Sequence, residues 1–264
     1  METEARRTDQ ESTADDTSAL GGMVKRLGAF HRTVDAGNLA DLGTRTRFYS
    51  VDTPIWSDPA RDDHLFVIDR GFAFAFSILP DGRRFISDIY GPGAICNWSR
   101  LNDARLRTDI LIKRRSNVAR IPIKGLRERA RDVPALSVAL TRHEHTRTLR
   151  ASRRTRSLVV GNANEKVMHT LLDIRDELGA VEQRQDWFVI PFTQVEWADT
   201  IGVSFVHLNR TIKDLVEAGR VVRNGRRYQI ADLADEFSRL EYRRSFHAGD
   251  REDEDLSKSF ASPN

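Results

Sequence analysis

The chain has 264 residues, of which 39% are hydrophobic, 8% aromatic and 31% charged. This length suits two small domains that each bury a core, and the composition is typical of a soluble globular protein. No apolar run approaches the roughly 18 residues that a membrane-spanning helix needs, and the N-terminus lacks the apolar core of a signal peptide. We therefore expect a cytoplasmic protein with no membrane partner.

The net charge of +3 is unevenly distributed along the chain. Residues 1–22 contain six acidic residues and two arginines, and residues 246–264 contain five acidic and two basic residues. Because the two ends together carry −7, the body between them carries +10. Both ends are poor in apolar side chains, so we predict that they are disordered acidic tails. The basic body favours a polyanionic partner.

The N-terminal domain is assigned to residues 23–130. Its first element is predicted to be a helix over residues 23–42, where apolar residues recur at roughly helical spacing. From residue 45 to residue 123 the pattern changes to short strands separated by turns. In FAFAFSI (72–78), phenylalanine and isoleucine alternate with alanine and serine, and the turn sequence PDG follows. This pattern predicts an antiparallel β-roll or barrel.

A long central helix is assigned to residues 131–160, with Pro134 opening the helical segment and Val160 ending it. Its first turns are apolar, but the rest is strongly basic. The basic positions are Arg142, Arg147, Arg150, Arg153, Arg154 and Arg156. Like charges three and four residues apart destabilise an isolated helix. The helix therefore needs a partner helix, an acidic neighbour or nucleic acid, unless it is only a solvated connection.

The C-terminal domain is assigned to residues 161–237 and begins with a helix capped by Asn164. Two shorter amphipathic helices follow. Thr193 and Glu196 form a capping box for the first of them. Gly202 ends that helix, and Ser204 can cap the next one.

The second short helix has two distinct faces. At 100° per residue, the predicted core stripe is Leu208, Thr211, Ile212, Leu215 and Val216. The side chains that point away are Val206, Arg210, Lys213 and Glu217, with Phe205 and Asn209 on one flank and His207 on the other. Behind this helix, VVRNGRRYQI predicts a hairpin with a type I′ turn at Asn224-Gly225 and three arginines around its tip.

Two helices joined by a glycine-containing turn, followed by a basic hairpin, form a winged helix-turn-helix, whose second helix fits the DNA major groove. We predict that Arg210 bonds a guanine edge and that Phe205 and Val206 contact a thymine methyl group. The full predicted DNA-binding set is Thr193, Gln194, Ser204, Phe205, Val206, His207, Asn209, Arg210, Lys213 and Arg226. The alternative is an ordinary helical hairpin that happens to expose a phenylalanine.

Four segments together resemble the Crp/Fnr superfamily of bacterial transcription regulators. They are FTQVEWADTIGVSFVHLNRTIKDLVEAG, the wing VVRNGRRYQI, the helix ANEKVMHTLLDIRDELG, and LPDGRRFISDIYGPGAICN in the N-terminal half. The resemblance covers roughly residues 25–237. It implies an α+β fold with a cyclic-nucleotide-binding-like β-roll, a long central helix and a C-terminal winged helix-turn-helix. It also implies a homodimer joined along the central helix, a two-fold symmetric double-stranded DNA site, and RNA polymerase as a further partner.

The resemblance places Arg210 on the base-reading arginine of the family. Phe205 and Val206 fall where many members carry arginine and glutamate. We therefore expect a target-sequence preference that differs from that of those members.

The same resemblance points to three possible effector-binding residues. Cyclic-nucleotide-binding members use a Gly-Glu pair for the ribose and an Arg-Ser or Arg-Thr pair for the phosphate. This chain has Cys96-Asn97 at the first position and Arg107-Thr108 at the second. Because the glutamate is missing and Asn97 is a weaker acceptor, we do not expect cyclic-nucleotide binding.

No cofactor is expected either. A single cysteine, interpreted as a small and partly buried residue, excludes an iron–sulfur cluster, and nothing marks a haem ligand. His143 and His145 point about 200° apart on a helix, so we interpret them as solvated residues rather than metal ligands.

The leading prediction is a DNA-binding transcription regulator. The alternative is a small-molecule or protein-interaction sensor module with a vestigial helix-turn-helix. An enzyme is not expected, because the sequence contains no nucleophile elbow, phosphate loop or metal-ligand spacing.

Overall fold

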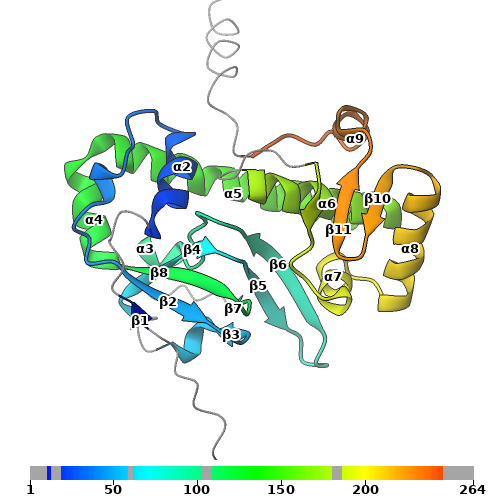
Figure 1. Cartoon of the computed structure of the whole chain (residues 1–264), viewed down its shortest axis with the longest axis horizontal. Coiled ribbons are helices and arrows are strands. Elements are labelled where there is room, and N and C mark those ends of the chain that lie inside the picture. The colour runs from blue at the N-terminus through cyan, green and yellow to red at the C-terminus, as the bar shows by residue number, and fades with distance from the viewer. Residues whose placement is uncertain (1–10, 13–18, 59–61, 103–108, 180–185, 246–264) are drawn as a thin grey trace, which may run out of the picture.

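The computed structural model of the protein describes residues 11–12, 19–58, 62–102, 109–179 and 186–245. Figure 1 shows the helices α5 and α6 running along the length of the molecule, with the roll at one end and a smaller domain with a hairpin at the other. The elements are β1 (Glu11–Ser12), α2 (Gly21–Gly28), η1 (Gly37–Leu39), β2 (Arg45–Tyr49), β3 (Thr53–Pro54), η2 (Ile55–Ser57), β4 (His64–Arg70), β5 (Ala73–Ile78), β6 (Arg84–Tyr90), α3 (Ser99–Asn102), β7 (Asp109–Ile112), β8 (Ser116–Pro122), α4 (Ile123–Asp132), α5 (Pro134–Val160), α6 (Ala163–Gly179), β9 (Phe188–Val189), α7 (Gln194–Ile201), α8 (Phe205–Glu217), β10 (Val221–Asn224), β11 (Arg227–Ile230) and α9 (Leu233–Arg239). Among the described residues, no helix is both long enough and apolar enough to cross a membrane.

The N-terminal domain is a roll of two antiparallel sheets, with the strand orders β1-β2-β8-β4 and β3-β7-β5-β6. The space between the sheets is filled by buried side chains that include Ala73, Ala75 and Ile110. Phe74 and Phe76 lie on the opposite face of β5, because successive side chains of a strand point to opposite faces. The structure therefore confirms both the antiparallel roll and the two-faced strand.

Different parts of the chain cover the outer faces of the two sheets. Helices α2 and α4 pack on β4 and β8 through side chains such as Leu27, Leu65 and Leu126. The outer face of β5 and β6 packs instead against the C-terminal domain. There Phe74 meets Phe192 edge to face, with ring centroids 5.9 Å apart. The phenylalanine face of β5 is therefore one part of the contact between the two domains.

The first helix is shorter than predicted. Instead of spanning residues 23–42, α2 ends at Gly28, where the low helix propensity of glycine favours an exit. Phe30, Val34 and Leu39 are still buried, but they reach the core from a largely irregular segment. The helix prediction is therefore wrong beyond Gly28.

The predicted N-terminal tail also needs correction. Glu11–Ser12 forms β1 and pairs with β2. Ala19 and Leu20, directly before α2, are buried in the core, and the burial of such apolar side chains stabilises an ordered chain. The remaining parts of the two predicted tails lie outside the described residues: 1–10, 13–18 and 246–264.

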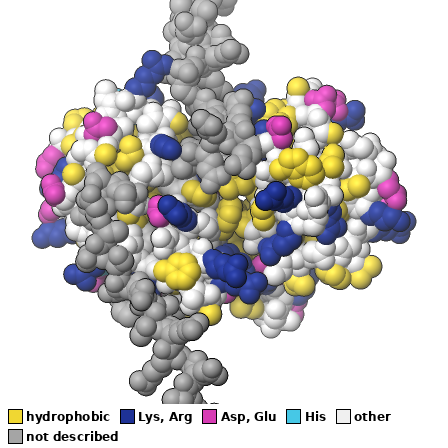
Figure 2. Space-filling model, in the orientation of Figure 1, with side chains coloured by type: hydrophobic (Ala, Val, Ile, Leu, Met, Phe, Trp, Pro, Cys, Tyr) yellow, Lys and Arg dark blue, Asp and Glu magenta, His cyan; other side chains and the backbone are white. Residues whose placement is uncertain are grey.

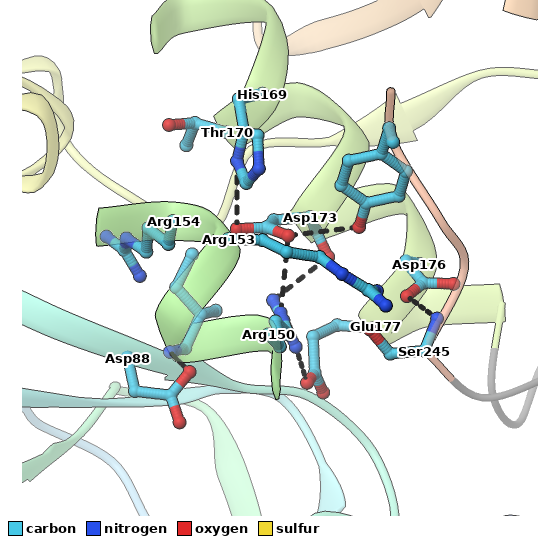
Figure 3. A network of polar contacts seen from close by, with 12 residues as sticks. Asp88, Arg150, Arg153, Arg154, His169, Thr170, Asp173, Asp176, Glu177 and Ser245 are labelled. Carbon is cyan, nitrogen blue, oxygen red and sulfur yellow. Dashed lines mark hydrogen bonds and ion pairs between the residues drawn. The ribbon is translucent and has the colours of Figure 1, made fainter. Parts of the chain in front are cut away.

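The central helix α5 runs from Pro134 to Val160, as predicted. Three of its arginines, Arg147, Arg150 and Arg154, are 6% exposed or less. They lie between β6 and α6, and Figure 3 shows acidic side chains gathered around this part of the helix. Of the alternatives left open for the basic helix, an acidic neighbour accounts for Arg147 and Arg150.

His143 lies on the same inner face, so its interpretation as a solvated residue is wrong. It is completely buried, and its ring centroid lies 6.0 Å from those of both Phe30 and Trp98. Burial holds its pKa well below the ordinary value. His145 is exposed, as predicted.

Glu177 is the acceptor that joins three helices. Arg147 and Arg150 of α5 both bind its Oε1, the former at 3.1 Å, and Arg26 of α2 binds its Oε2 at 2.9 Å. Nearby, Oδ1 of Asp173 accepts from Nε of Arg150 at 3.3 Å. Burial alone would raise the pKa of Glu177, but the surrounding arginines hold it well below its ordinary value. The cluster therefore keeps its ions charged inside the protein.

The segment that follows α9 closes over this cluster. The Tyr242 hydroxyl donates to Oδ1 of Asp173 at 3.0 Å, and the backbone N–H of Ser245 donates to Oδ2 of Asp176 at 2.8 Å (Figure 3). Tyr242 and Ser245 are both buried. The packed C-terminal unit thus extends beyond residue 237, where the sequence placed its end.

Helix α6 forms where it was predicted, but its cap is Asn162 rather than Asn164. Oδ1 of Asn162 accepts from the backbone N–H of Glu165 at 3.1 Å. In return, Oε2 of Glu165 accepts from the backbone N–H of Asn162 at 2.8 Å. The reciprocal pair needs a glutamate three residues after the cap, and only Asn162 has one.

Candidate nucleic-acid interface

Helix α7 begins at the predicted capping box. The backbone N–H of Glu196 donates to Oγ1 of Thr193 at 3.2 Å, and the backbone N–H of Thr193 donates to Oε2 of Glu196 at 2.8 Å. Trp197 and Ile201 face the core. At the other end, Gly202 has φ 69°, which glycine adopts without a side-chain clash. The cap and the glycine together fix both ends of this helix.

Two ion pairs attach α7 to the β-roll, and sequence reasoning missed both. Nζ of Lys113 binds Oε1 of Glu196 at 2.7 Å, so the capping glutamate serves the helix and the domain contact at once. Arg84 binds Asp199 at 2.8 Å. The partners in the first pair are 83 positions apart, and no local pattern in the sequence connects them.

Helix α8 begins at Ser204, whose Oγ accepts from the backbone N–H of His207 at 3.2 Å. The side chains of Leu208, Thr211, Ile212 and Leu215 are buried, as predicted. Val216 was assigned to the same stripe but is 38% exposed, so the core stripe is narrower than expected. Gly219 has φ 69° just beyond the helix, which lets the chain turn into the hairpin.

The outward face of α8 is confirmed. Val206, Arg210, Lys213 and Glu217 are all exposed, and so are Phe205 and His207. Lys213 and Glu217 approach each other at 3.5 Å across one helical turn. Because the buried stripe packs on α6 and α7, this outward face is held on a rigid support.

The wing is a three-stranded antiparallel sheet in the order β10-β11-β9. Its turn differs from the prediction. Asn224 still pairs with Arg227, so the two loop residues are Gly225 and Arg226 rather than Asn224 and Gly225. Only Gly225 has positive φ, at 60°, which indicates a type II′ turn instead of type I′.

The side chains of two predicted DNA-binding residues form hydrogen bonds within the protein. Nδ2 of Asn209 donates to the backbone carbonyl of Phe205 at 3.1 Å. The guanidinium of Arg226 donates to the carbonyls of Ile190 and Phe192 at 3.2 and 3.3 Å. Arg226 therefore braces the wing against the start of α7.

The two capping hydroxyls remain able to donate. Thr193 and Ser204 each accept a backbone N–H through oxygen, and both residues are exposed. A hydroxyl that accepts one hydrogen bond keeps its own proton for another acceptor. Gln194, beside Thr193, is half-buried. These groups are suited to phosphate contacts at the two helix starts.

Exposed basic side chains lie on this surface, namely Arg210 and Lys213 of α8 and Arg223 and Arg227 of the wing. In Figure 2, basic side chains gather near the middle of the molecule, and a few lie at its right-hand edge, where Figure 1 places α8. A hollow of about 250 Å³ separates the wing from the start of α7, and its walls include Thr193, Arg223 and Arg226. The surface can therefore accept an anionic backbone beside the outward face of α8.

Asn97, the first of the predicted effector-binding residues, has a side chain that is hydrogen-bonded within the protein. Oδ1 of Asn97 accepts from the backbone N–H of Phe66, and Nδ2 donates to the carbonyl of His64, both at 2.9 Å. The amide thus joins the start of α3 to β4. Arg107 and Thr108, the other two predicted effector residues, lie outside the described residues.

Cys96 is fully buried rather than partly buried, and burial raises the pKa of its thiol well above the ordinary value. In the described part of the chain, no three His, Cys, Asp or Glu side chains are close enough to hold a metal ion. Burial therefore holds the Cys96 thiol in its protonated, less reactive form.

Comparisons with known proteins agree with this architecture. A profile described as a Crp-like helix-turn-helix domain matches residues 165–235. No match was found among curated proteins.

Three solved structures illustrate the likeness of the whole fold. FixK2 from Bradyrhizobium japonicum is 17% identical with a TM-score of 0.56, over 72% of this chain and 90% of that one. The c-di-GMP responsive global regulator CLP of Xanthomonas campestris is 21% identical with a TM-score of 0.55, over 75% and 100%. TTHB099, a CRP family transcriptional regulator from Thermus thermophilus, is 19% identical with a TM-score of 0.57, over 77% and 98%. The chain therefore carries a Crp-like helix-turn-helix domain within the fold of Crp/Fnr-type transcription regulators.

Proposed function

We propose that the protein is a sequence-specific DNA-binding transcription regulator that inserts α8 into the major groove of a two-fold symmetric site. The observation that carries this proposal is the outward face of α8. Val206, Arg210 and Lys213 project from a helix that is capped at its start and packed on a continuous core. A helix held in this way presents its first turns to base edges, and the wing and helix caps supply phosphate contacts.

We also propose a homodimer joined along α5. The buried arginines lie on the inner face of this helix, so they leave its outer face for a partner. That outer face exposes Val138, Leu149, Val159 and Val160 together with His145 and Ser152. Exposed apolar side chains along one helix favour pairing with a second copy, and a two-fold axis between copies would match a symmetric DNA site. RNA polymerase is the further partner that a regulator of this kind implies.

We propose no cyclic nucleotide as effector. Both polar atoms of the Asn97 amide already bind the backbone of β4. The side chain is also only 5% exposed, so it does not present its amide to a ribose hydroxyl.

The proposal is tested by selection from a random duplex library at physiological salt, with the full chain and with Arg210→Ala. We expect the full chain to select a symmetric motif with half-sites about 34 Å apart. Arg210→Ala should lose one base preference at a cost of about 1–3 kcal/mol. Arg239→Ala is the matched control, because Arg239 is an exposed arginine on α9, outside the predicted surface.

Each outcome separates the two main functional readings. A symmetric motif that loses one base in Arg210→Ala but not in Arg239→Ala supports the regulator and its dimer. Retention of DNA without any motif would mean binding to the backbone alone. If no duplex is retained, the regulator proposal fails and a sensor module with a vestigial helix-turn-helix takes its place.

A further inference from the structure

The first turn of α8 exposes two apolar side chains to solvent, at positions where a surface helix normally carries polar residues. Val206 is 74% exposed and Phe205 is 45% exposed. Other apolar side chains of the helix, such as Leu208 and Ile212, are buried. Leaving a large apolar side chain in water forgoes roughly 1.5–3 kcal/mol of burial. These two residues are therefore suited to a partner that covers them.

The surroundings of this apolar pair show what kind of partner fits. Arg210 follows Val206 by one helical turn on the same side of the helix, and Lys213 lies one turn further. All four of these side chains are exposed. The wing adds exposed arginines nearby, including Arg227. An apolar spot set in a basic surface matches an anionic partner that offers one small apolar group.

The major groove of DNA offers such a group. Among the base edges displayed there, the C5-methyl of thymine is the apolar feature, and the other groups are hydrogen-bond donors and acceptors. The polar alternative on this flank is weakened, because Nδ2 of Asn209 is turned back onto the carbonyl of Phe205. The start of α8 is therefore better suited to a methyl group than to a hydrogen-bonding base edge.

We infer that Phe205 and Val206 select thymine by contacting its C5-methyl group, beside the base pair that Arg210 reads. This inference rests on the proposed DNA-binding function and specifies its target chemistry. Four residues of α-helix rise about 6 Å, and successive base pairs are about 3.4 Å apart. The thymine thus lies about one or two base pairs from the base bound by Arg210.

The test replaces each thymine of the selected operator, one at a time, with deoxyuridine. Deoxyuridine keeps the same hydrogen-bonding edge and lacks only the methyl group. Binding of the full chain is measured by fluorescence anisotropy at fixed salt. At one thymine position in each half-site, we expect a single replacement to lower the affinity roughly three- to tenfold, as for the loss of one apolar methyl contact. The equivalent position in the other half-site should show the same effect.

The variants Phe205→Ala and Val206→Ala assign the contact. The variant that removes the partner of the methyl group should bind thymine and uracil operators equally, because nothing remains to distinguish them. Val216→Ala is the matched control, since Val216 is a partly exposed valine at the far end of the same helix. It should keep the full sensitivity to uracil.

Three results separate this inference from the function on which it rests. Equal affinity for every uracil operator, with a base preference still lost in Arg210→Ala, would overturn the methyl contact and keep the regulator. Uracil sensitivity that persists in both alanine variants would assign the methyl effect to DNA shape and also reject the inference. Failure to select any duplex would overturn both proposals.

Discussion

Arginine side chains occupy two opposite environments in this protein. On α5, Arg147 and Arg150 are buried and face the carboxylates of α6 and β6. On α8 and the wing, Arg210 and Arg227 are exposed to solvent. The first group binds the two domains of one chain together, whereas the second offers positive charge to another molecule.

An apolar and an acidic side chain show a similar contrast in burial. Val206 extends into solvent from α8, while the charged Glu177 is completely buried. At these two positions, burial follows the presence of a partner rather than residue type. A buried charge such as Glu177 is stable because opposite charges are paired with it. An apolar side chain such as Val206 is exposed where we expect a partner to cover it.

The largest effect should come from removing the central acceptor of the buried cluster. Glu177→Gln keeps the shape of the side chain but leaves Arg26, Arg147 and Arg150 with one negative charge fewer. Breaking a buried ion pair in this way typically costs about 3–5 kcal/mol. We expect a fall of this size in the free energy of unfolding, measured by urea denaturation.

The exposed pair on α8 provides the matched control. Glu217→Gln removes the partner of Lys213 at the surface, where an ion pair contributes about 0.2–1 kcal/mol. Equal losses in the Glu177 and Glu217 variants would contradict the contrast between buried and exposed charges.

A smaller effect, of opposite sign, is expected at Asp176. Burial raises the pKa of this carboxyl from 3.8 to about 6, against the opposing effect of Arg150. Because the folded-state pKa is the higher one, folding favours the protonated form. The resulting stability is fully present below about pH 4 and is lost as the pH rises to about 6.

Asp176→Asn removes this titration and keeps an oxygen for the N–H of Ser245. At pH 7 we expect the variant to be about 1–3 kcal/mol more stable than the parent chain. The difference should shrink as the pH falls from 6 to 4. Denaturation curves at several pH values measure it, and a difference that does not change with pH would rule out the buried carboxylate as its cause.

The smallest effect concerns the segment that follows α9. Tyr242→Phe keeps the ring stacked on Phe237 and removes the hydroxyl that donates to Asp173. The loss of this hydrogen bond should cost about 1 kcal/mol of unfolding free energy. Hydrogen exchange should quicken along α6 and not along α8. An equal increase along both helices would show that Tyr242 has no specific role in holding α6.

Much of the candidate interface could be predicted from the sequence, because its signals are local. The capping box joins Thr193 to Glu196, and the turn at Gly202 is followed directly by the cap at Ser204. The outward positions of α8 follow from a fixed angle per residue. Every one of these features is decided within a few residues, so a linear pattern contains the required information.

Local signals failed where the same residues fitted more than one local structure. Asn162 and Asn164 both precede α6, and only the glutamate three residues later decides between them. In the wing, a shift of one residue exchanged a type I′ turn for a type II′ turn, because Gly225 suits the first central position of the latter. Beyond Gly28, apolar spacing continued although the helix had ended.

The sequence by itself determined the antiparallel roll, the long helix from Pro134 to Val160, and the helix-turn-helix with its outward arginine. Periodicity, caps and glycines act over one or two turns of chain, and they survive without knowledge of distant partners. The tertiary structure alone decided which arginines are buried, that His143 is enclosed, and that Lys113 holds the cap of α7. Those outcomes depend on charges and rings brought together from distant segments, and their cost or gain exists only once water has been excluded from between them.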